Sequence, residues 1–156
     1  MGKFAENTSV SSEKSRMEIE RILGRYGADG FMYGWEPDRA IIAFRMTGRH
    51  VKFVLPMPDR SSREFTHTPE KNMRRSESAA ASAFEQAVRQ RWRALALVIK
   101  AKLEAVETGI TVFDDEFMAH IQLPNGETVG NWMRPQIELA YEKGTMPALL
   151  PAPGGK

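Results

Sequence analysis

The sequence contains no cysteine among its 156 residues. This absence excludes disulfides, thiolate nucleophiles and cysteine-ligated zinc, and it fits a reducing cytosol. No apolar run approaches the 18 residues that suggest a membrane span, so we expect no membrane partner. The N-terminal residues have no apolar core like that of a signal peptide. The two common glycine-rich phosphate-binding patterns, GxxxxGK(S/T) and GxGxxG, are also missing.

Net charge is small as well, at +2, but the two signs occupy different parts of the chain. Residues 39–102 hold 14 Lys/Arg and 5 Asp/Glu, a net charge of +9. Residues 103–156 hold 3 Lys/Arg and 8 Asp/Glu, a net charge of −5. Such asymmetry suggests a polyanion partner for one face of the protein. Because each neutralised phosphate releases counterions, DNA or RNA is the first partner to consider.

The first half of the chain shows a helix followed by strands. Residues 1–11 are polar and patternless, which predicts a flexible arm. Ser15 and Glu18 then form an S-x-x-E capping box, and the next residues place one apolar face on a helix: Ile19, Ile22, Leu23 and Tyr26. Three β-rich runs follow with tight turns between them, which indicates an antiparallel meander: residues 31–35, 40–46 and 50–55.

A long helix is the largest expected element. Residues 57–77, which precede it, are basic and aperiodic and predict a long mobile loop; loops of this length are often functional. The helix is expected from about Ser78 to Thr108, and its apolar stripe consists of Phe84, Val88, Trp92, Leu95, Ile99, Leu103 and Val106. Leu97 falls off this stripe, which leaves a second packing surface open.

The C-terminal third has a mixed pattern. Asp114 is expected to cap a short helix that includes His120, and the alternative is a hairpin around the turn at residues 124–126, with Ile121 and Leu123 before it and Val129 after it. A last helix is expected around residues 137–141, with Pro135 in its first turn and Gly144 after its end. Residues 145–156 form a Pro/Gly-rich tail. The overall prediction is one α+β domain over residues 12–144.

Cations of the basic segment are the first candidate site. If the sheet, the loop and the long helix present them on one face, they can follow a phosphate backbone; the candidates are Arg45, Lys52, Arg74, Arg75, Arg89 and Arg93. This reading requires Arg74 and Arg75 to lie beside Arg89 and Arg93. The alternative is that the cations pair with the acidic C-terminal third. Three strand aromatics could stack on bases but are expected in the core: Phe31, Tyr33 and Trp35.

Two further functions remain open. Opposite charge blocks, the Leu97 flank and the Pro/Leu tail suggest a protein-interaction module, either a homo-oligomeric adaptor that binds a second copy of itself or an inhibitor of a host protein. A metal-dependent enzyme is the second alternative, since carboxylates and a histidine can hold a divalent cation: Asp114, Asp115, Glu116 and His120. Acidic residues at a helix start also suit the helix dipole without any metal. The sequence predicts no cofactor and no enzyme activity.

Several segments carry a resemblance. They are SRMEIERILGRYGADGFMYGW, FVLPMPD, FEQAVRQRWRALALVIKAKLEAVETGI and IQLPNGETVGNW. Together they resemble small uncharacterised proteins encoded in bacteriophage and prophage genomes, over about residues 15–150. The resemblance implies a viral or mobile-element origin and a place in the cytoplasm of an infected or lysogenic bacterial host. It implies no catalytic residues. By analogy, it favours a non-catalytic nucleic-acid-binding accessory protein or a modulator of host machinery.

Overall fold

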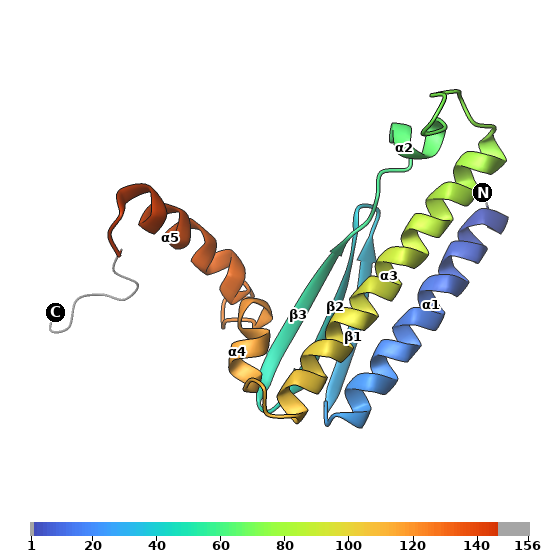
Figure 1. Cartoon of the computed structure of the whole chain (residues 1–156). Coiled ribbons are helices and arrows are strands. Elements are labelled where there is room, and N and C mark those ends of the chain that lie inside the picture. The colour runs from blue at the N-terminus through green and yellow to red at the C-terminus, as the bar shows by residue number, and fades with distance from the viewer. Residues whose placement is uncertain (1, 147–156) are drawn as a thin grey trace, which may run out of the picture.

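The computed structural model describes residues 2–146, with side chains from residue 13 onward. Its architecture is α+β, as the sequence predicts: an N-terminal helix, a three-stranded antiparallel sheet, a long central helix and C-terminal helices (Figure 1). In chain order the elements are α1 Gly2–Arg25, β1 Gly30–Glu36, β2 Arg39–Met46, β3 Arg49–Pro56, α2 Arg63–Thr66, α3 Glu77–Glu107, α4 Phe113–Phe117, the 3-10 turn η1 Met118–His120, and α5 Val129–Lys143. Within residues 2–146 no helix is long and apolar enough to cross a membrane.

The sheet has the order β1-β2-β3, and its three strands match the predicted meander. At the β2–β3 turn Thr47 and Gly48 both have positive φ, at 49° and 76°, as a type I′ hairpin requires. Alternate residues such as Ile42 and Phe44 are buried because successive side chains point to opposite faces. The opposite face, here called the outer sheet face, consists of Met32, Ile41, Ala43, Arg45, Lys52 and Val54.

Helices α1 and α3 lie side by side over the buried face of the sheet (Figure 1). Ile19 and Leu23 of α1 are 0% and 1% exposed, and the indole of Trp92 on α3 lies 5.7 Å from the ring of Tyr33. The predicted apolar stripe of α3 is therefore confirmed as core. Trp35 differs from the prediction, since it is 71% exposed. It lies at the end of β1, next to the turn into β2.

The start of α1 corrects two predictions. The helix begins at Gly2, so residues 2–11 are helical and do not form a flexible arm. Ser15 lies within the helix and is not its cap. Residues 3–14 contain neither proline nor glycine, and extending a helix that is already anchored by packing costs far less than nucleating one. The capping pattern at Ser15 and Glu18 therefore occurs inside a continuous helix.

Residues 57–77, predicted as a mobile loop, are folded. Phe65 on α2 is 5% exposed and meets the ring of Phe84 edge-on at 5.6 Å. His67 and Arg74 form an antiparallel bridge, and the Arg75 amide donates to the Thr66 carbonyl at 2.7 Å. One buried aromatic and these backbone bonds are enough to order the segment, although no periodicity reveals them. It leads into α3 at Ser76, whose side chain caps that helix.

The short helix and the hairpin-like turn, predicted as alternatives, both occur, one after the other. Helix α4 is capped by Val112 without a side-chain hydrogen bond, so Asp114 lies in its first turn and is not the predicted cap. A hairpin-like turn then closes between Gln122 and Thr128. Helix α5 begins at Val129 because the Thr128 side chain accepts from the Asn131 amide, which places Pro135 inside the helix and not in its first turn. Gly144 ends α5 in the left-handed conformation, at φ 69°. Of the predicted tail, residues 147–156 lie outside the described residues.

Candidate interaction surfaces

The six predicted nucleic-acid contacts do not converge. Arg45 and Lys52 share the outer sheet face, as predicted, but α1 and α3 cover the other face. Arg74 and Arg75 precede α3. At 1.5 Å per residue, Arg89 and Arg93 lie about 18 and 24 Å along the helix axis from its first residue, Glu77. The structure brings the six together in pairs, in three separate regions. The predicted neighbourhood of the four arginines is therefore wrong.

Several cations of the basic segment are neutralised within the chain. Arg45 donates to the Asp29 carboxylate at 2.9 Å, and Arg49 and Lys102 pair with Asp114 and Glu116 at 3.0 and 3.2 Å. The last two pairs join the basic segment to the acidic C-terminal third, as the alternative interpretation of the charge pattern predicts. Of the six predicted contacts, five form no ion pair among the described residues, and they are Lys52, Arg74, Arg75, Arg89 and Arg93.

The acidic residues of α4 serve as attachments of that helix. Hydrogen bonds from Arg49 hold the Asp114 carboxylate, and the same contact raises the pKa of the arginine above its ordinary value. Lys102 Nζ donates to both the backbone carbonyl and the side chain of Glu116. Within the described residues no group of three or more His, Asp or Glu is placed to hold a metal ion. The structure therefore offers no support for a metal centre here.

His120 packs instead of facing a carboxylate. Its ring is stacked on Phe53 with centroids 4.0 Å apart. Partial burial lowers the pKa of His120, and the nearby charge of Lys102 lowers it further. A neutral imidazole is therefore favoured at this position, and it closes the core beside Phe117.

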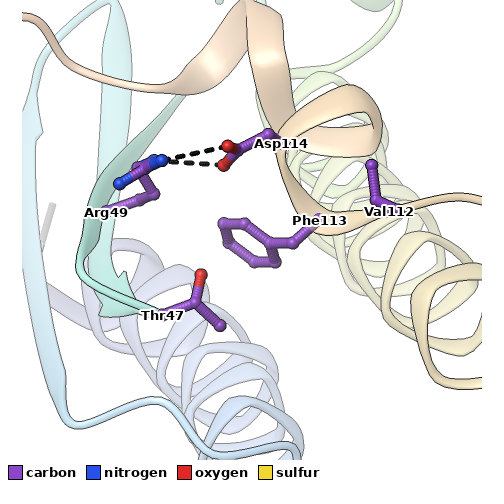
Figure 2. Close-up of a pocket in the computed structure, with 5 residues that line it drawn as sticks. All are labelled: Thr47, Arg49, Val112, Phe113 and Asp114. Carbon is purple, nitrogen blue, oxygen red and sulfur yellow. Dashed lines mark hydrogen bonds and ion pairs between the residues drawn. The ribbon is translucent and has the colours of Figure 1, made fainter.

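An open pocket of ≈ 270 Å³ lies where α4 meets the β2–β3 turn (Figure 2). Its lining residues are Thr47, Arg49, Val112, Phe113 and Asp114. The Arg49–Asp114 pair forms one side, and the Phe113 ring lies between that pair and Thr47. The charges of Arg49 and Asp114 are already paired with each other. The lining residues contain no pair of a nucleophile and a free base. The pocket therefore shows no catalytic arrangement.

Helix α5 is the most unusual feature of the surface. It projects away from the sheet and the two long helices (Figure 1) and touches the rest of the described chain mainly at η1. There Gly130 packs so closely that an added Cβ would lie 2.9 Å from the Ala119 carbonyl oxygen. Further along the helix apolar side chains remain in water, and their exposed fractions are 49% for Ile137, 38% for Leu139 and 87% for Tyr141. The sequence predicted a helix over these residues but did not indicate that it is exposed.

A second apolar surface lies on the outward side of α3. Leu97 and Val98 are 63% and 44% exposed, opposite the buried stripe, which confirms the prediction that Leu97 falls outside the core. Small residues extend this surface along the helix, at Ala87, Ala94, Ala101 and Ala105. The sequence contains this 3-4 spacing, although only the position of Leu97 stood out from it.

No protein-family model, no curated protein and no solved structure matches the chain.

Proposed function

We propose that this protein is a protein-interaction module that presents α5 to a partner protein. One observation carries the proposal: the helix is anchored at its first turns, and the apolar face beyond them is not covered by any described residue. Soluble proteins rarely leave such surface exposed without an interaction to fill it.

The partner is a protein with an apolar groove that accepts one amphipathic helix. Met133, Ile137 and Tyr141 follow each other at intervals of four residues, the spacing of helix-in-groove anchors. Trp132 and Leu139, seven residues apart, form a second exposed apolar strip on the other side of the helix. Tyrosine and tryptophan are the residues that most often dominate such interfaces. Glu138 and Glu142 lie on the flank between these two apolar strips, where their charges stay in water.

Site-specific photo-crosslinking tests this proposal. A photoreactive amino acid replaces Ile137 in one variant and Glu138 in a matched control, and both are irradiated in the cells that make the protein. Capture of one protein from position 137 alone supports the proposal when that purified protein also binds the wild type and loses more than about tenfold in affinity with Ile137→Asp. Equal capture from both positions, or unchanged affinity of Ile137→Asp, contradicts it.

Nucleic-acid binding is the second candidate. The observation in its favour is that Lys52, Arg74, Arg89 and Arg93 have no ion pair among the described residues. These separate cations support weak backbone contacts whose affinity falls as salt rises. Binding of single- and double-stranded DNA across a salt series tests it. Affinity at low salt no better than that of a neutral control protein removes this candidate.

A further inference from the structure

Helix α3 carries an outward face that nothing in the described chain covers, and we propose that this face binds α3 of a second copy, antiparallel, about a two-fold axis at Leu97 and Val98. The inference goes beyond the proposed function and does not depend on it. It concerns a different helix, and it makes the protein a dimer that carries two α5 helices.

The apolar content of the face suits close helix pairing. Residues at alternating intervals of three and four form one seam along a helix, and this seam runs through Ala87, Gln90, Ala94, Leu97 and Ala101. Leu97 and Val98 are its only large side chains in the middle of the helix, and both are well exposed. Small neighbours on either side let two helix axes approach to about 8–10 Å. With the axis at this point each Leu97 lies beside Leu97 of the other copy, and the small residues of both helices flank the pair.

Charge along α3 specifies the occupant of the face. On one flank of the seam, cations come first, at Arg89, Arg93 and Lys100, and anions follow, at Glu104 and Glu107. None of these five forms an ion pair among the described residues. At 1.5 Å per residue Arg93 and Glu104 are about 16 Å apart along one helix, too far to pair within the chain. A charge order that reverses along one flank is complementary to itself only in an antiparallel arrangement.

The register follows from that order. With the axis between Leu97 and Val98, Arg89 lies within about 1.5 Å of the level of Glu107 of a second copy, and Arg93 lies within about 3 Å of the level of Glu104. In an antiparallel helix pair the same flank of each helix faces the other. Two-fold symmetry repeats both contacts, so one register forms four ion pairs. In a parallel pair of copies opposite flanks face each other, so Arg89 and Arg93 do not meet Glu104 and Glu107 of the second copy.

Charge exchange between copies tests the proposal. The wild type is expected to sediment with twice the 17.6 kDa mass of the chain at micromolar concentration, and Leu97→Glu to weaken self-association by more than about tenfold. Arg93→Glu and Glu104→Arg are each expected to weaken it alone. An equimolar mixture of these two variants restores a dimer, because each new glutamate meets a new arginine.

Control variants distinguish a dimer through α3 from binding through the outer sheet face or through α5. Met32→Glu on the outer sheet face and Ile137→Asp on α5 leave the dimer intact, and circular dichroism confirms that each variant is folded. A monomeric wild type, or a dimer that Leu97→Glu does not weaken, overturns the proposal. Failure of the charge-exchange mixture to restore association overturns the antiparallel register. If Ile137→Asp stays a dimer but loses partner binding, the result supports the proposed role of α5 and leaves the α3 dimer unaffected.

Discussion

Phe117 holds the C-terminal helices on the sheet, and its truncation gives the sharpest stability prediction. The residue is fully buried, and its ring meets Phe44 and Phe53 edge-on at 6.0 and 6.3 Å and lies 4.7 Å from Phe113. Phe117→Ala removes these contacts and leaves a cavity, a change that costs about 3–5 kcal/mol in a well-packed core. For a chain of this length each kcal/mol lowers Tm by about 2–4 °C, so the expected decrease is roughly 6–20 °C.

Thermal unfolding followed by circular dichroism measures this decrease. Tyr141→Ala is the matched control, since Tyr141 is 87% exposed and surface truncations usually change stability by less than about 0.5 kcal/mol. A decrease of less than about 2 °C for Phe117→Ala refutes the reasoning. It would mean that α4 separates from the sheet before the rest unfolds and adds nothing to the cooperative core.

Two other predictions concern glycine and pH. Gly130→Ala is expected to destabilise the protein in urea unfolding, because its Cβ meets the Ala119 carbonyl oxygen at 2.9 Å; overpacking of this kind costs about 1–3 kcal/mol. Gly24→Ala, with no atom within 4 Å of its Cβ, is expected to stabilise α1 by about 0.5–1 kcal/mol, and the opposite sign at either position contradicts this packing. Burial and Lys102 lower the pKa of folded His120 below its ordinary 6.5. The stability due to its neutral form is therefore complete above pH 6.5 and is lost as the pH falls below 6.5 through the lowered pKa. His120→Phe should show a smaller difference in urea midpoint between pH 7.5 and 5 than the wild type; an equal difference assigns the effect to other groups.

Periodicity was enough to predict most of the sheet and α3. Alternation in residues 40–46 and the 3-4 spacing from Val88 to Leu103 reflect one buried face each, so a local pattern carries the tertiary information. The same logic succeeded for Leu97, whose position off the stripe indicated an exposed apolar side chain. In these elements the burial of each residue follows from its own sequence neighbours.

Other features depend on contacts distant in the sequence. Phe65 is buried because Phe84 lies beside it, and nothing near Phe65 in the sequence announces this partner. The Arg49–Asp114 pair joins residues 65 positions apart, so the charge pattern indicated pairing without naming the partners. The predicted start of α5 was wrong because proline favours the first turn of a helix and Pro135 was placed there. The cap at Thr128 begins the helix earlier.

The candidate site was harder to predict than the fold. A count of cations along the chain does not show that Arg45 and Lys52 lie on the sheet face opposite to α3, the helix that carries Arg89 and Arg93. Likewise, the apolar residues around Ile137 predict a helix, and only the structure shows the helix projecting away from the rest of the chain (Figure 1). Exposure, and not composition, distinguishes an interaction helix from a core helix.

Hydrogen exchange of the α5 amides tests the central claim most directly. A helix of 15 residues without a packed face is marginal in water, so residues 137–143 of the isolated protein should exchange far faster than the core amides of α3, such as Ile99. Binding of the partner should slow them. Protection of residues 137–143 equal to that of Ile99 in the isolated protein contradicts the account, because α5 is then already covered.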